Sequence, residues 1–155
     1  MPSYKGHLAG GAAAYVITLA CLVICTTLNP SLFAVLEWLA LCMIGSLFPD
    51  VDIKSKGQKL FYMLLLLTMI ILAFFEHWQA LVFLSFIAVI PLCSKHRGLF
   101  HNIWFVVLLP VTISWLLCIF WLPHCSSIIF YDCLFFISGA ISHLYLDLGF
   151  HRLFR

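Results

Sequence analysis

The chain alternates between long apolar stretches and short polar connections. Six of the stretches approach the ~20 apolar residues with which an α-helix crosses the hydrocarbon core of a bilayer. They run over Leu8–Leu28, Ser31–Phe48, Gln58–Phe75, Trp78–Cys93, Phe100–Leu122 and Ser126–Gly149. The pattern predicts an all-α, polytopic membrane bundle of about six transmembrane helices, the fourth of which is short.

Lysine and arginine indicate which side of the membrane each connection faces, because short basic loops stay in the cytoplasm. The connections at Asn29-Pro30, Glu76-His77 and Pro123–Cys125 carry no basic residue. With six spans, all basic residues fall on the other side: Lys5, Lys54, Lys56, Lys59, Lys95, Arg97, Arg152 and Arg155. Omitting Trp78–Cys93 as a span would break this pattern. Both termini are therefore predicted to be cytoplasmic.

Hydrophobic residues make up 65% of the 155 positions and charged residues 9%, whereas about a quarter of the residues in a soluble domain are charged. So little charge cannot cover a water-exposed surface, so the lipid bilayer is the expected partner. The net charge of +2 is too small to indicate nucleic-acid binding. No repeat or linker divides residues 1–155, which are expected to form one domain.

Residues of the types that bind metal ions gather on the predicted cytoplasmic side. They come from the N-terminus, the second-to-third connection, the fourth-to-fifth connection and the end of the sixth span. The candidates are His7, Asp50, Asp52, His96, His101, His143 and Asp147. Because four separated segments reach the same membrane face, their side chains are predicted to converge on a metal site.

His143 and Asp147 are four residues apart, so they share one face of a helix. Gly139 precedes them on the same face and would let a neighbouring helix approach closely. An imidazole and a carboxylate placed in this way can bind a divalent cation. The alternative interpretation is a hydrogen-bonded pair at a helix end, without a metal.

Pro49 is predicted to break the second span, because the residue before a proline is pushed towards extended geometry. In an extended segment Asp50 and Asp52 would point to the same side and present paired carboxylates. The alternative interpretation is an acidic turn that leaves the membrane.

His96 and His101 are five residues apart and would diverge by about 140° on a regular helix. A shared site therefore requires the turn that Gly98 permits. Alternatively, both histidines, like His7, are ordinary polar residues at the membrane boundary. On the opposite side, Glu37 and Asp132 lie within the spans and would either contact each other or reach lipid head groups.

Four short motifs follow one another along the chain: Gly6-His7, Pro49-Asp50-Val51-Asp52, His96-Arg97-Gly98-x-x-His101 and Ser142-His143-x-x-x-Asp147. In this order they resemble the bacterial inner-membrane proteins described as membrane-bound, metal-dependent hydrolases, often called YdjM-like. The resemblance covers nearly the full chain. It implies a location in the bacterial inner (plasma) membrane, and it implies that the seven candidates above correspond to metal-site positions of the family.

The resemblance also suggests a distant kinship with zinc-dependent phospholipase C and single-strand nucleases, which hydrolyse phosphodiesters with clustered zinc ions. The chain departs from the family pattern at three positions. Phe100 and Asn102 stand where the family commonly has Thr and Ser, and Ile53 stands where a histidine often follows the second aspartate. These departures remove groups that would surround the ions, so they bear on the number of metals and on catalysis.

Together these observations lead to the hypothesis of a metal-dependent hydrolase at the cytoplasmic membrane interface that cleaves phosphoester bonds of lipid or other substrates. Zinc, or else manganese, would lower the pKa of a bound water. Asp50 or Asp52 would act as ligand or general base, and Arg97 would neutralise developing negative charge. The lysines of the second-to-third connection would attract anionic phospholipid, although topology alone also explains them.

Two other functions remain open from the sequence. A small metal-ion or proton transporter would use the cytoplasmic cluster as one gate and Glu37 and Asp132 as the continuation of a path. A membrane scaffold would instead hold a structural metal. A transporter needs polar residues near the middle of the bilayer, and the spans contain few of them. This scarcity favours the enzyme.

Overall fold

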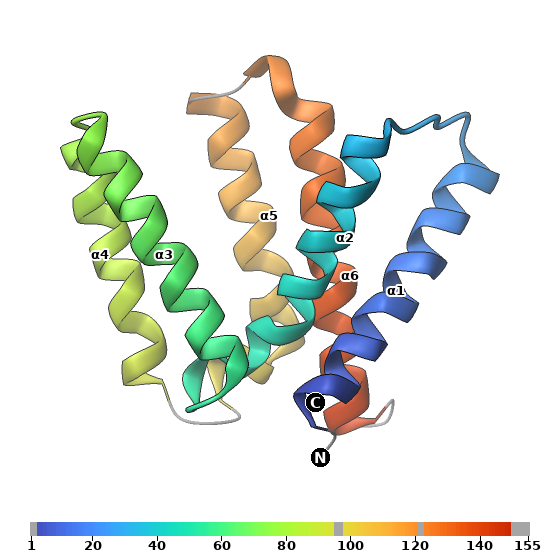
Figure 1. The fold of residues 1–155 in the computed structure, drawn as a ribbon, viewed down its shortest axis with the longest axis horizontal. Helices are drawn as coiled ribbons and strands as arrows, with labels where there is room; N and C mark the ends of the chain where they lie inside the picture. The colour runs from blue at the N-terminus through green and yellow to red at the C-terminus, as the bar shows by residue number, and fades with distance from the viewer. Residues whose placement is uncertain (1–2, 95–97, 121–122, 150–155) are drawn as a thin grey trace.

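The computed structural model describes residues 3–94, 98–120 and 123–149, and these residues form helices and short connections without any strand (Figure 1). The predicted all-α fold is confirmed. In chain order the elements are α1 (Tyr4–Cys25), α2 (Leu32–Leu47), the 3-10 helix η1 (Phe48–Asp52), α3 (Lys56–Phe74), α4 (Trp78–Cys93), the 3-10 helix η2 (Leu99–His101), α5 (Ile103–Phe120), the 3-10 helix η3 (Pro123–Cys125) and α6 (Ser126–Leu148).

Within the part of the chain that the structure describes, four segments are long and apolar enough to cross a membrane: α1, α2 with η1, α3 and α6. The α4 and α5 helices are apolar but shorter. Each predicted span corresponds to one helix, with three shifts of three or more residues at the ends. The first helix runs from Tyr4 to Cys25 rather than from Leu8 to Leu28, which places His7 at the end of its first turn. The fifth begins at Ile103, because Phe100 and His101 belong to η2, and Leu122 lies outside the described residues.

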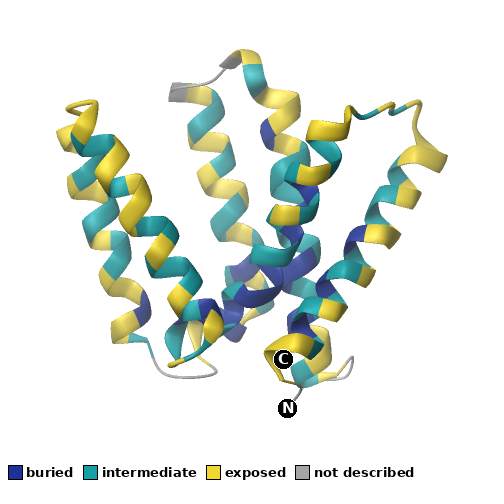
Figure 2. Cartoon of the chain, viewed as in Figure 1, coloured by how far each residue is buried: buried dark blue, intermediate teal, exposed yellow. Residues whose placement is uncertain are grey.

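The α6 helix is the centre of the bundle. It packs against α2, α1 and α5, and the α2–α6 pair has the most extensive contacts of all. The α3 and α4 helices form a hairpin that joins the bundle mainly where α3 packs on η1, so its upper part stands apart in Figure 1. Buried residues gather where α2, η1 and α6 meet, whereas the outward faces of the helices are exposed (Figure 2).

The exposed faces are apolar, as expected for helices surrounded by lipid. Phe33, Met63, Phe83 and Trp104 are each more than 60% exposed, and large apolar side chains of this kind line every helix. In water such a surface would be an aggregation hazard. The surface therefore agrees with the membrane location that the composition predicts.

Two glycines allow α2 and α6 to approach closely. A Cβ atom added at Gly45 would collide with the backbone carbonyl of Phe136, and one added at Gly139 would collide with the carbonyl of Cys42. Each glycine thus receives the backbone of the other helix, as small residues do in membrane bundles, where packing rather than the hydrophobic effect drives helix association. The close approach predicted at Gly139 is confirmed.

The prediction of an extended segment after Pro49 is wrong. Phe48 has helical dihedral angles, φ −62° and ψ −41°, and η1 continues from α2 as a 3-10 helix. Proline is tolerated there because it stands in the first turn of η1, where its missing N–H is not needed. Pro49 and Val51 are buried, and this tertiary packing overrides the local preference of the residue before proline.

Replacing Gly139 by alanine is expected to destabilise the protein by about 1–3 kcal/mol, because the new methyl group meets a backbone carbonyl that cannot move without separating α2 from α6. Gly10→Ala is the matched control. There the added Cβ meets Cδ1 at the end of the flexible Leu146 side chain, at 2.6 Å. Unfolding midpoints of both variants in mild detergent give the comparison. Equal midpoints would contradict the close packing at Gly139.

Candidate metal centre

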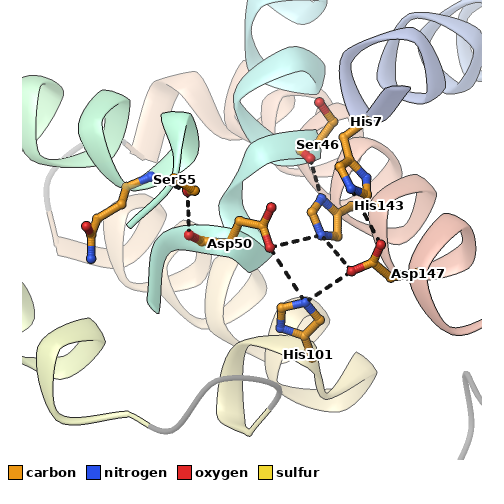
Figure 3. A network of polar contacts seen from close by, with 8 residues as sticks. His7, Ser46, Asp50, Ser55, His101, His143 and Asp147 are labelled. Atoms are coloured by element: carbon orange, nitrogen blue, oxygen red, sulfur yellow. Dashed lines mark hydrogen bonds and ion pairs between the residues drawn. The ribbon is translucent and has the colours of Figure 1, made fainter. Parts of the chain in front are cut away.

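Four side chains from three separate elements converge at one end of the bundle (Figure 3). Asp50 comes from η1, His101 from η2, and His143 and Asp147 from α6. One nitrogen or carboxylate oxygen of each residue lies within 4.8 Å of the corresponding atom of every other. Two imidazoles and two carboxylates in one cluster form a typical donor set for a divalent transition metal.

Four distances inside this cluster are close to the spacing of ligands around one ion. The Nε2 atom of His143 lies 3.5 Å from Asp50 Oδ1 and 3.7 Å from Asp147 Oδ2. The Nε2 atom of His101 lies 3.8 Å and 3.6 Å from the same two oxygens. Donors at about 2.0–2.2 Å from a tetrahedral zinc ion stand about 3.3–3.6 Å apart. The separations exceed those of strong charge-assisted hydrogen bonds, about 2.7–2.9 Å, and are close to those of a coordination shell.

His143 is oriented by the end of α2. Its Nδ1 atom donates a hydrogen bond of 2.7 Å to the backbone carbonyl of Ser46. This carbonyl is available because α2 ends at Leu47, and the last carbonyls of a helix have no partner within it. The hydrogen bond fixes the proton on Nδ1 and leaves the lone pair on Nε2, which faces the cluster. Such a backbone partner is typical of metal-binding histidines.

Asp147 connects the cluster to α1. While Oδ2 faces His101 and His143, Oδ1 lies 3.5 Å from the Nε2 atom of His7. The ring of His7 also stacks on that of His143, with centroids 3.7 Å apart and planes 15° apart. His7 is outside the group of four donors. It is therefore placed to hold the far oxygen of Asp147, next to the ion rather than on it.

Asp50 forms the open side of the cluster. Its side chain is 19% exposed, compared with at most 3% for the side chains of His101, His143 and Asp147. The Ser55 hydroxyl caps α3 by accepting from the N–H of Gln58, and it donates to the backbone carbonyl of Asp50 at 2.7 Å. The start of α3 thus fixes the position of η1 and of the carboxylate that it carries.

Asp52 lies in the same 3-10 helix as Asp50 but outside the group of four donors. Asp52 still acts electrostatically on His101. Burial lowers the pKa of His101 below its ordinary value of 6.5, and His143 lowers it further, while Asp52 and Asp50 oppose the shift. At neutral pH the imidazole is therefore uncharged, which is the form that binds metals.

The cluster also contains a polar atom that a cation would satisfy. The Nε2 atom of His143, which faces Asp50 and Asp147, is buried and makes no hydrogen bond to the described residues. A buried polar atom without a hydrogen bond costs about 1–3 kcal/mol. The carboxylates of Asp50 and Asp147, whose ligand atoms lie within 4.8 Å of each other, also repel each other unless a positive charge lies between them. These residues fit a divalent cation.

Of the seven residues predicted to bind metal, the structure brings Asp50, His101, His143 and Asp147 together, with His7 and Asp52 beside them. His96 and Arg97 lie outside the described residues. Two groups that position the donors, the Ser46 carbonyl and the Ser55 hydroxyl, were not predicted from the sequence. A serine before a helix is a recognisable cap signal, but no sequence pattern indicates which helix-terminal carbonyl meets a histidine nearly a hundred residues away.

The fold and the cluster define a class: multi-pass helical membrane proteins with a polar, metal-competent site at one end of the bundle. Within that class, the model of a family described as YdjM inner membrane protein matches residues 1–151. The chain belongs to this family, and it is accordingly a multi-pass protein of the inner membrane. No curated protein and no solved structure matches it. The kinship with phospholipase C and single-strand nucleases is thus without support.

Protein purified in mild detergent is expected to retain about one zinc or manganese ion per chain. His143→Ala removes a donor and Asp147→Asn replaces a charged carboxylate with a neutral amide. Each should abolish retention, because the remaining ligands hold an ion far less well than the full set of four. His77→Ala, at the other end of the bundle, is the control. Elemental analysis of the three variants gives the result. A metal-free, well-folded wild type would exclude this centre.

His7→Ala is expected to weaken metal binding about 10–100-fold without abolishing it, as the loss of a group that orients a ligand does. Titration with a competing chelator measures the affinity. X-ray absorption spectroscopy of the zinc-loaded protein measures the number of bound imidazoles, which should be the same in His7→Ala as in the wild type. A loss of one imidazole would show that His7 is itself a ligand.

Proposed function

We propose that the protein is a membrane-embedded, metal-dependent hydrolase that cleaves phosphoester bonds at the cytoplasmic membrane interface. The observation that carries the proposal is the four-donor cluster of Asp50, His101, His143 and Asp147, whose ligand atoms lie within 4.8 Å of one another. The partly exposed Asp50 gives this cluster an open side, which a purely structural metal site does not need.

A divalent cation held there would supply the Lewis acidity that activates a water and polarises the substrate oxygen. The chain's own residues do the rest. His101, His143 and Asp147, whose side chains are buried, would present their donor atoms to the ion from the closed side of the site. Asp52 lies next to the cluster without belonging to the four donors, so it is the better candidate for the general base. Arg97, which is outside the described residues, is the candidate for neutralising the developing charge.

The position of the cluster favours a substrate at head-group depth. Lys54 and Lys56 follow η1 and are exposed, and the Nζ atom of Lys56 lies 5.9 Å from the centre of the Tyr4 ring. Exposed lysines beside the membrane surface attract anionic lipids. A phosphoester in a lipid head group is therefore a substrate that both the charge and the depth of the site accommodate.

A metal-ion or proton transporter is the second candidate, and one observation favours it. Asp132 lies close enough to Glu37 for their charges to interact within the spans of α6 and α2. A path would have to join this pair to the metal cluster. However, a groove extends from Phe48 towards Asp132, and it is lined almost entirely by apolar side chains. Moving an ion into such surroundings has a large desolvation cost.

The enzyme hypothesis predicts that Asp52→Asn retains the metal but slows hydrolysis about 10²–10⁴-fold, as the loss of a general base does. Turnover of bis(p-nitrophenyl) phosphate, and of phosphatidylglycerol in vesicles, measures the effect. Glu76→Gln makes the same chemical change at the opposite end of the bundle and should have no effect. Metal-loaded protein that cleaves neither substrate but carries zinc or protons across liposomes would establish the transporter instead.

A further inference from the structure

A groove runs along the membrane-spanning part of the bundle beside the metal cluster. Both α2 and α5 pack on α6, but they make little contact with each other. The groove is the space between them. Leu41 and Phe48 of α2 and η1 form one wall, Leu109 and Ile113 of α5 form the other, and Phe136 of α6 lies on the floor. The volume is about 250 Å³.

The inner end of the groove adjoins the metal cluster through a chain of aromatic rings. Phe48, which lines the groove, lies two residues before Asp50 in η1. Its ring meets those of Phe136 and Phe100, with centroids 5.3 Å and 5.5 Å away. Phe100 is buried and directly precedes His101. An apolar group that filled the groove would therefore end next to the residues that present two of the four donors.

We propose that the groove binds one hydrocarbon chain of a membrane lipid whose phosphate-containing head group lies at the metal cluster. The inference deepens the proposed function, on which it rests, by assigning the substrate class as an amphiphile rather than a soluble phosphoester. The bundle offers such a molecule two matched regions in the right order. A polar, cation-competent site with exposed Lys54 and Lys56 lies at membrane-surface depth, and an apolar groove leads from it into the bilayer.

The size of the groove suits a single hydrocarbon chain. At ~30 Å³ for a group the size of water, a space of about 250 Å³ holds about eight methylene groups. Ser114 and Asp132 are the polar members of the lining. They lie towards the far ends of α5 and α6, so the apolar part extends from Phe48 to this pair.

The affinity of the lipid for this site depends on both of its parts. A chain that leaves bilayer lipid for the groove gains no hydrophobic free energy, because both surroundings are apolar. Selective occupancy must therefore come from packing in the groove and from the head group at the metal cluster. Labelling of the groove should consequently depend on the bound metal, which labelling by bulk surrounding lipid would not.

The experiment uses the full-length protein in vesicles that contain phosphatidylglycerol with a photoactivatable diazirine in one acyl chain. After irradiation, mass spectrometry locates the labelled residues. In the zinc-loaded wild type, labels are expected to concentrate on Leu41, Leu109 and Phe136, and chelation of the metal should remove them. Ser114→Trp and Ile113→Trp fill the groove and should also lose these labels. Thr112→Trp, on the same helix but outside the lining, should keep them.

The outcomes separate this inference from the proposed function. Labels spread evenly over the lipid-facing sides of α1, α3 and α5, or groove labels that persist after chelation, would overturn the inference. Unchanged labelling in both Ser114→Trp and Ile113→Trp would also overturn it. Retention of the metal by these variants shows that they are folded. Hydrolysis of bis(p-nitrophenyl) phosphate and of phosphatidylglycerol is measured in parallel. Metal-dependent groove labelling without hydrolysis of either substrate would support lipid binding and reject the hydrolase. Hydrolysis without groove labelling would support the hydrolase and reject lipid binding in the groove.

Discussion

The close crossing of α2 and α6 is the constraint on which the site depends. The backbone of α6 packs directly against Gly45, and the backbone of α2 packs directly against Gly139. This close approach brings the end of α2 against the face of α6 that carries His143. The carbonyl of Ser46 then meets the imidazole at 2.7 Å and fixes its tautomer. A larger residue at either glycine would move the carbonyl away and free the ring. The orientation of His143 at the end of the bundle thus depends on the glycine packing in its middle.

The fold could be predicted from the sequence because lipid imposes simple rules on a chain. Backbone groups in hydrocarbon must be paired within a helix, and basic loops stay on one side. These rules located six helices and brought distant histidines and aspartates to one face. They did not give local geometry at the membrane boundary, where water and protein both satisfy the backbone. There the extended segment predicted at Pro49 is a 3-10 helix, since burial of Pro49 and Val51 outweighs the local preference.

Within the site, the sequence was most informative where spacing alone determines geometry. His143 and Asp147 lie on one helix face because they are four residues apart, and their side chains do converge on the cluster. His7 and His101 required the tertiary structure. The stacking of His7 on His143 depends on how α1 packs against α6, and His101 reaches the cluster through a 3-10 turn after Gly98. Single-residue patterns cannot encode contacts that arise from the packing of separate helices.

The attachment of the α3–α4 hairpin determines how Asp50 is held in the cluster. The hairpin is joined to the bundle chiefly through η1, and Ser55 at its start holds the carbonyl of Asp50. The element that anchors the hairpin is therefore the one that carries the partly exposed carboxylate of the cluster. Asp50 is thus the donor whose position depends on the hairpin, whereas His143 is fixed by the Ser46 carbonyl and by the α2–α6 crossing.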